Sequence, residues 1–269
     1  MKLESSYRDI GYLDLLARQR SFIHQLDPRA KVLTTLVFMA FVISFDKYSV
    51  TALIPFVLYP VISIALGNLP PGYLLRKMLV ATPFAFFVGI FNPLFDQEVL
   101  VHLGNVGISG GWISFASIMI RFCLTVSAAL ILIASTGFDE VCLALRRTGI
   151  PAVLCAQFLF LYRYLFVLVD EASRMTRARA MRSFNGRGMG MKVFGFMIGQ
   201  LLLRTIDRAR RIHLAMLCRG FDGELRLVRS YRLSRRDVAY VLGWSMLFVL
   251  MRRYDVPQLI GGLVLRSAG

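Results

Sequence analysis

The stretch "GWISFASIMIRFCLTVSAALILIAS", residues 111–135, carries a single charged residue, Arg121. An α-helix needs about 20 predominantly apolar residues to cross the hydrocarbon core of a bilayer, and this stretch exceeds that length. The whole chain is similarly apolar, since 57% of its 269 residues are hydrophobic and 18% are charged, with a mean hydropathy of +0.61. A soluble domain of this size is less apolar. We therefore expect an all-α polytopic membrane protein with about five transmembrane helices.

Further expected crossings lie on both sides of this stretch. The apolar runs that could form them are residues 32–45, 50–66, 79–95 and 238–251. The first run follows Asp27-Pro28, a favourable helix start with aspartate as N-cap and proline as the first helical residue. Because this run is shorter than a crossing, we expect Arg29 and Lys31 to snorkel to the near membrane surface. We expect Arg121 to face the helix bundle or to snorkel outward, because an exposed cation at mid-span costs about 2.5–3.5 kcal/mol.

The formal net charge of +16 is concentrated in one part of the chain. Residues 170–236 hold 16 Lys and Arg against five Asp and Glu, a net charge of +11. In an apolar chain this concentration indicates a cytoplasmic face. Nucleic-acid binding is disfavoured because the run contains no recognised binding module. The segment "DQEVLVHLGNVGISG", residues 96–110, has acidic residues and no Lys or Arg, so we predict an external loop there.

The charge pattern also bears on two apolar runs, residues 152–169 and 193–203. A full crossing by the first run would place the arginine-rich residues 170–192 outside, against the positive-inside tendency. The second run is only about half a crossing long. We therefore predict two long helices that dip into the inner part of the membrane and emerge in the cytoplasm. The chain then divides into a membrane-spanning bundle, a cytoplasmic region and a C-terminal membrane segment whose path stays open, at residues 1–136, 137–236 and 237–269.

A short motif occurs twice in the basic region. "RARAMRSFNGR", residues 177–187, and "HLAMLCRGFDG", residues 213–223, share the pattern Ala-x-x-x-Arg-small-Phe, 37 residues apart. The shared arginines are Arg182 and Arg219. A guanidinium at a fixed helix end can make charge-assisted hydrogen bonds to carboxylates and carbonyls of a partner. The alternative is plain helix capping with attraction to lipid headgroups.

Each motif also carries the signal of a helix end. Gly220 in the second motif, and Asn185-Gly186 in the first, are typical left-handed cap residues. With Gly220 at the C′ position, Phe221 occupies C″ and can fold back on Met216. A basic residue in the last turn also suits the negative end of the helix dipole. The sequence therefore predicts two rigid, arginine-bearing helix tips.

Taken together, "LDPRAK" (26–31), the apolar first half and "AMLCRGFDGEL" (215–225) resemble the transmembrane T component of energy-coupling factor (ECF) transporters, in particular the CbiQ type. The resemblance covers nearly the whole chain. It implies a scaffold with long cytoplasmic coupling helices, each ending in an Arg-Gly-type motif that docks in a groove of one of two ABC ATPase subunits.

The resemblance assigns the coupling role residue by residue. In the second motif it falls on Arg219 and Gly220, and in the first on Arg182 and Ser183. Ser183 departs from the family pattern, because it stands where glycine is usual. An alternative register for the first motif consists of Gly186, Arg187 and Gly188.

The same resemblance implies the partners and the location. The partners are two ABC ATPase subunits (CbiO-like) and a membrane substrate-binding S component (CbiM-like, with or without a CbiN-like subunit), in the lipid of a prokaryotic inner membrane. The implied process is cobalt or nickel uptake, with a vitamin ECF transporter as the alternative. ATP would be bound by the partners and no cofactor by this chain, which lacks a Gly-x-x-x-x-Gly-Lys-Ser/Thr phosphate loop.

Other functions receive little support from the sequence. A secondary transporter is disfavoured because the four expected crossings up to residue 135 contain no Asp, Glu or His. An enzyme is disfavoured because no nucleophile with its base is evident at membrane depth. No metal-ligand spacing appears among His24, His102 and His213. We expect the four cysteines, which form no Cys-x-x-Cys pair, to be free thiols; they are Cys123, Cys142, Cys155 and Cys218.

Overall fold

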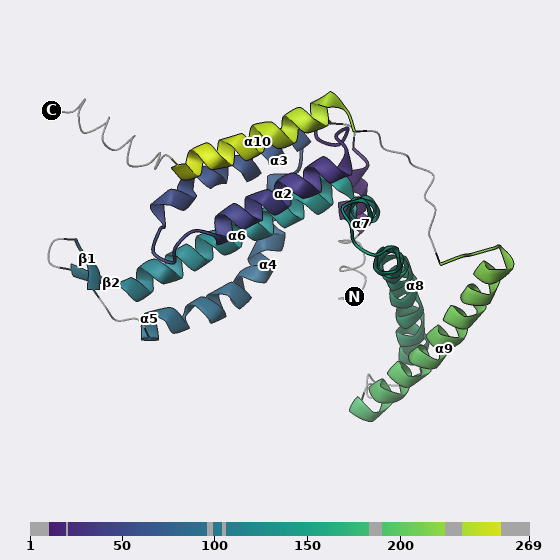
Figure 1. Ribbon diagram of the computed structural model, residues 1–269. Helices are drawn as coiled ribbons and strands as arrows, with labels where there is room; N and C mark the ends of the chain where they lie inside the picture. Colours follow the sequence, from purple (N-terminus) through teal and green to yellow (C-terminus); the bar gives the residue numbers. More distant parts are fainter. Residues whose placement is uncertain are drawn as a thin grey trace. The chain divides into compact units, whose positions relative to one another are not determined.

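The computed structural model describes residues 11–19, 21–95, 99–103, 106–182, 190–223 and 233–253. Residues 11–17 are helical. The elements that follow (Figure 1) are α2 (Pro28–Ile43), the 3₁₀ helix η1 (Thr51–Val57), α3 (Leu58–Gly67), α4 (Pro71–Gly89), α5 (Phe91–Phe95), β1 (Val99–Leu103), β2 (Val106–Ser109), α6 (Gly110–Thr136), α7 (Phe138–Arg147), α8 (Ala152–Arg182), α9 (Met191–Cys218) and α10 (Arg235–Arg253). The helical fold class is confirmed. The short antiparallel pair β1–β2 lies where we predicted only a loop.

The chain forms two compact units. The larger unit consists of Leu15–Gly137 and Tyr231–Gly269, and the smaller of Met1–Asp14 and Phe138–Ser230. The helices α2, α3, α4, α6 and α10 therefore belong to the larger unit, whereas α7, α8 and α9 belong to the smaller one. The chain passes between the units three times, after residues 14, 137 and 230.

Helix α2 begins as the sequence predicts. Asp27 is its N-cap and Pro28 its first residue, and the Asp27 carboxylate accepts a hydrogen bond of 2.9 Å from the backbone N–H of Arg29. The prediction for Lys31 is wrong. Its side chain is 3% exposed and donates a 3.0 Å hydrogen bond to the carbonyl of Ser135. Ser135 lies in the last turn of α6, where carbonyls lack partners within the helix, so the ammonium group is satisfied there rather than at the membrane surface.

Helix α2 lies beside α6 and α10 (Figure 1), and contacts at its two ends define their directions. Its start meets the end of α6 through Lys31 and the start of α10 through a hydrogen bond between Asp27 and Asp237. Its end meets the end of α10, since Arg252 donates to the carbonyl of Ser44 at 3.4 Å. Helix α10 therefore runs parallel to α2, and α6 runs antiparallel to it.

Arg121, the charged residue within the longest apolar stretch, also contacts the chain near a helix end. Its guanidinium donates to the backbone carbonyl of Asp46, just beyond the C-terminus of α2. A cation at the negative end of a helix dipole is favourable. Arg121 therefore faces the bundle, one of the two placements that we expected.

The core of the larger unit is aromatic. Phe38 of α2 lies 4.5 Å from Tyr59 of α3 and 5.4 Å from Phe248 of α10, measured between ring centroids. Phe56 of η1 stacks on Phe248 at 5.9 Å. Such ring pairs contribute about 0.5–1.5 kcal/mol each beyond the burial of their apolar area. This cluster packs the C-terminal helix onto the N-terminal half of the chain.

Three helical segments among the described residues are long and apolar enough to cross a membrane: Pro71–Pro93, Gly110–Thr136 and Ala152–Arg182. A shorter apolar segment covers Thr51–Gly67. The third long segment contains the run that we excluded as a crossing on grounds of charge. Length and composition permit a crossing there, so the exclusion rests on the positive-inside tendency alone and stays a prediction.

Candidate functional site at the arginine-tipped helix pair

Helices α8 and α9 cross each other in Figure 1 and run in roughly opposite directions. Arg204 in the middle of α9 donates a 2.7 Å hydrogen bond to Glu171 in the second half of α8. Phe221, directly after α9, lies 6.4 Å from Phe160 near the start of α8, measured between ring centroids. The end of one helix therefore lies near the start of the other.

This arrangement separates the two predicted arginine tips. Arg182 is the last residue of α8, and Phe160, which marks the position of the other tip, lies 22 residues earlier in the same helix. At 1.5 Å per residue, the tip at Arg219 lies about 33 Å from Arg182 along the helix axis. Both side chains are exposed. The two arginines are therefore presented at two well-separated points of one helix pair.

The tip at Arg219 has the geometry that the sequence predicts. Helix α9 ends at Cys218, and Gly220 adopts the left-handed conformation with φ +77°. The N–H of Phe221 donates to the carbonyl of Met216, and the N–H of Gly220 to that of Leu217, both at 3.0 Å. These two bonds form a Schellman motif, which satisfies carbonyls that a helix end otherwise leaves free. The predicted helix end is confirmed.

At the first tip, the structure describes Arg182 but not the residues that directly follow it. Arg182 closes α8, whereas Ser183 and the alternative register of Gly186, Arg187 and Gly188 lie outside the described residues. The assignment of the first docking residue stays a prediction. The docking role of Arg219 and Gly220 likewise stays a prediction.

Some arginines of the helix pair already have a salt-bridge partner and others do not. Arg174 pairs with Asp170 on the same helix, and Arg204 pairs with Glu171 across the pair. The guanidinium groups of Arg182 and Arg219 have no hydrogen-bond or ion-pair partner within the described part of the chain. An unpaired guanidinium keeps its planar set of donors for another molecule. The two tips are the parts of the pair best suited to bind a partner's acidic groups.

An apolar groove of about 400 Å³ runs between the two helices, lined by Phe160, Tyr164, Val167, Leu168, Thr205, Ile206, Arg208, Ala209, Ile212 and Met216. A smaller, charged hollow of about 250 Å³ shares Leu168, Thr205 and Arg208 with it. Helix α9 buries none of its residues. Most side chains of its apolar first half are exposed, with Phe196 at 70%, and one side of this half is half-buried. The pair thus offers apolar surface along its length and cations at its tips.

The cysteines occupy contrasting environments. All four are free thiols, as we expected; Cys142 and Cys155 are buried, and Cys218, beside Arg219, is exposed. Burial raises the pKa of the Cys142 thiol to about 11, so this group stays protonated and unreactive at neutral pH. No group of three or more His, Cys, Asp or Glu in the part of the chain that the structure describes is arranged to hold a metal ion.

The sequence did not reveal two polar contacts that hold the larger unit together. The first joins Asp237 to Asp27, and the second joins Lys31 to Ser135. Ser234 and Asp237 form a capping-box pattern before an apolar run, which was a readable signal for the start of α10. The capping pattern does not predict the hydrogen bond to Asp27, because the two residues are 210 positions apart in the sequence.

The long apolar helices and the basic helix pair define a helical membrane protein with a strongly cationic region. A family model described as cobalt transport protein, CbiQ, matches residues 19–229. The chain belongs to this family of cobalt transport proteins.

Individual relatives are distant in sequence. The chain is 31% identical over 156 residues to the cobalt transport protein CbiQ of Rhodobacter capsulatus, covering 56% of this chain and 62% of the relative. It is 27% identical over 249 residues to the energy-coupling factor transporter transmembrane protein EcfT of Lactococcus lactis, covering 86% and 92%. An uncharacterised protein of Methanocaldococcus jannaschii is 27% identical over 254 residues, covering 91% and 86%.

Proposed function

We propose that this chain is the coupling subunit of an ECF-type ABC importer in the prokaryotic inner membrane. In this role it transmits movements of two ATPase subunits to a membrane S component that carries the substrate. The chain itself performs no hydrolysis. Family membership and the names of the relatives support the assignment to a transporter, and the helix pair supports the coupling role.

The observation that carries the proposal is the separation of two exposed arginines, Arg182 and Arg219, which lie far apart on the pair of α8 and α9 and have no partner among the described residues. A single partner groove could not receive both tips, because they lie about 33 Å apart along the helix axis. Two ATPase subunits provide two grooves. When the subunits approach each other, both ends of the helix pair are displaced, and a tip fixed by a Schellman motif passes on a displacement that a flexible loop would absorb.

The tips suit such docking chemically. Each guanidinium can bind a carboxylate or carbonyls in a partner groove, and neither Arg182 nor Arg219 is bonded to any other residue that the structure describes, so no such bond must first be broken. Truncating one member of a buried, hydrogen-bonded charge pair at an interface costs about 2–5 kcal/mol. Two such contacts are enough to determine recruitment of the ATPase subunits.

Substitution of the two arginines tests this proposal. We expect Arg219→Ala, and more strongly the combination of Arg182→Ala with Arg219→Ala, to weaken co-purification of the ATPase subunits and abolish uptake while leaving membrane insertion intact. Lysine at these positions should rescue only partly, because an ammonium group lacks the planar fork. Arg210→Ala is the matched control, since Arg210 is an exposed arginine of α9 away from its tip.

The outcomes separate the alternatives. Normal ATPase recruitment and uptake in the double variant would refute the docking role. Loss of function in Arg187→Ala but not in Arg182→Ala would move the first contact to the register of Gly186, Arg187 and Gly188. If Arg210→Ala loses as much ATPase recruitment and uptake, the effect depends on the total positive charge and not on the two tips.

Cobalt or nickel is the proposed substrate class, and the CbiQ family supports it. An S component for another solute, such as a vitamin, is the second candidate. It is favoured by the relatives named EcfT, such as that of Lactococcus lactis, which cover 86% of the chain against 56% for the Rhodobacter CbiQ. Identification of the small membrane protein that co-purifies with this chain distinguishes the two. Cobalt uptake that depends on this chain supports the first.

A further inference from the structure

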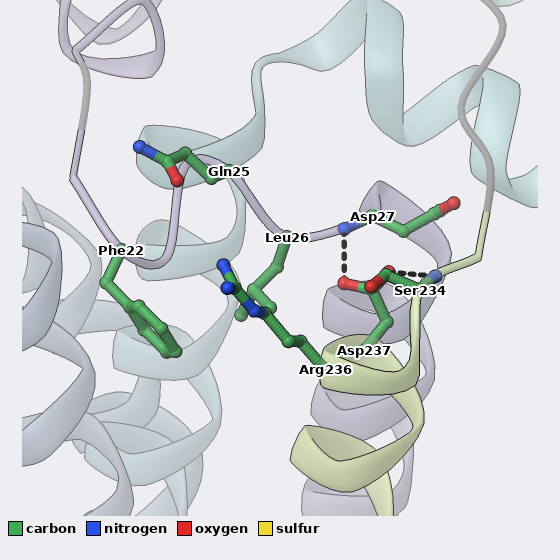
Figure 2. A pocket seen from close by; sticks show the side chains of 7 residues that line it. All are labelled: Phe22, Gln25, Leu26, Asp27, Ser234, Arg236 and Asp237. Atoms are coloured by element: carbon green, nitrogen blue, oxygen red, sulfur yellow. Dashed lines mark hydrogen bonds between the residues drawn. The ribbon is translucent and has the colours of Figure 1, made fainter.

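One carboxylate holds the starts of two helices. The backbone N–H of Asp27, the N-cap of α2, donates to Oδ1 of Asp237 at 2.9 Å. The backbone N–H of Ser234, which directly precedes α10, donates to Oδ2 of the same carboxylate at 2.8 Å. Figure 2 shows the Asp237 carboxylate between these two nitrogens, beside a cavity of about 160 Å³. Asp237 therefore caps its own helix and ties it to α2.

A second contact ties the start of α2 to α6. Lys31, in the first turns of α2, donates to the carbonyl of Ser135 at 3.0 Å. Ser135 lies two residues before Gly137, at which the chain leaves the larger unit. We call the group of Asp27, Lys31, Ser135 and Asp237 the polar clasp. It joins the ends of α2, α6 and α10 at one end of the larger unit.

The polar clasp is buried although it contains three ionisable groups. Asp27 and Lys31 are each 3% exposed, and Asp237 is 4% exposed. Burying a charged group is costly unless it is hydrogen-bonded, and apolar packing could fill such positions at least as stably. Stability alone therefore does not explain the buried charges. A role in connecting the three helices explains them better.

The polar clasp lies close in sequence to two of the points where the chain passes between the units. The chain runs from α6 into α7 after Gly137, which has φ +84°. It returns after residue 230, shortly before α10 begins at Arg235. Two of the three connections between the units thus adjoin helices whose terminal turns the clasp joins to α2.

We propose that the polar clasp is a coupling device, with Lys31 and Asp237 as positioning residues. A displacement of α8 and α9 reaches α6 through α7, which follows it directly after Gly137, and the clasp distributes it over α2, α6 and α10 as one body. Without the clasp, the terminal turns of α6 and α10 fray and absorb the displacement. The inference rests on the proposed function, because it requires that movement of the smaller unit drives transport.

Two substitutions cut the clasp at different bonds. Lys31→Met removes the ammonium but keeps an unbranched side chain of similar length, and replacing a buried charge by an apolar residue is often neutral for stability. Asp237→Asn keeps one acceptor oxygen, so that it can hold only one of the two N–H groups. Matched controls are Lys192→Met and Asp170→Asn, which change exposed residues of α9 and α8.

The experiment measures folded yield, thermal unfolding in detergent, ATPase co-purification, ATP hydrolysis and cobalt uptake of the assembled transporter. We expect both clasp variants to be folded, to recruit ATPase subunits and to hydrolyse ATP as the wild type does, with uptake per ATP hydrolysed reduced roughly tenfold or more. The controls should retain wild-type uptake.

Two results would overturn the proposal. Wild-type uptake per ATP in folded Lys31→Met and Asp237→Asn would show that the clasp transmits nothing. If folded yield falls as much as uptake in both variants, the clasp only stabilises the fold. Arg219→Ala is measured in parallel, so that the docking proposal is tested separately. If the docking proposal is wrong, Arg219→Ala recruits the ATPase subunits as the wild type does. The uptake of the clasp variants still decides the role of the clasp.

Discussion

At the scale of the residue, the tip of α9 depends on Gly220 more than on any contact of the arginine itself. Gly220 has φ +77°, a conformation that other L-residues adopt only at a cost of about 1–2 kcal/mol. A Cβ added there would meet no atom within 4 Å. The requirement for glycine is therefore purely conformational. It fixes the direction in which the chain leaves the helix, and with it the place of Arg219.

This reasoning gives a graded prediction for Gly220→Ala. The substitution should reduce ATPase co-purification, but less than Arg219→Ala does, because the guanidinium is retained on a strained helix end. Gly199→Ala is the control: Gly199 is in the interior of α9, where a Cβ also meets nothing and alanine favours the helix by up to about 1 kcal/mol. Equal recruitment by both glycine variants would show that a fixed tip is unnecessary.

At the scale of the element, neighbouring residues predict helix ends, whereas contacts between residues far apart in the sequence cannot be predicted in this way. The N-cap Asp27 and the end of α9 at Gly220 follow from a few neighbouring residues, and both are confirmed. The burial of Lys31 depends on a carbonyl 104 residues away. Judged from α2 alone, a lysine beside a short apolar run is expected at the membrane surface. The antiparallel course of α8 and α9, which separates the arginine tips, likewise requires tertiary contacts.

At the scale of the whole molecule, the family and the helical membrane class could be predicted from sequence, whereas the sidedness rests on charge alone. Three segments suffice in length and composition for crossings among the described residues. The α8 segment, Ala152–Arg182, is one of them, although its second half continues into the arginine-rich region. Composition identifies what can lie in a membrane, but orientation depends on how Lys and Arg are distributed between the loops on its two sides.

Thiol labelling tests the predicted orientation. In a chain without its native cysteines, a cysteine introduced at Ser183 should resist a membrane-impermeant reagent in intact cells and react after permeabilisation. A cysteine introduced at Gln97 should react in intact cells, because that loop is predicted to be external. Labelling of the Ser183 position in intact cells would reverse the orientation and place the arginine tips on the wrong side for ATPase subunits.

Protection of the two tips by bound ATPase subunits is the most direct test of the central claim. Cys218 is naturally exposed beside Arg219, and Met181, 83% exposed beside Arg182, can be replaced by cysteine. Each cysteine is studied alone, in chains whose other cysteines are replaced by alanine. Lys47→Cys, between α2 and η1, serves as an unprotected control.

The measurement is the alkylation rate of each thiol in purified chain, with and without the ATPase subunits. At an ATPase concentration about ten times the dissociation constant, we predict a roughly tenfold slower rate at both tips and no change at Lys47→Cys. Adding Arg219→Ala should remove the protection of Cys218. If the subunits bind while Cys218 and Met181→Cys react as fast as in the free chain, the two arginines do not dock and the account is contradicted.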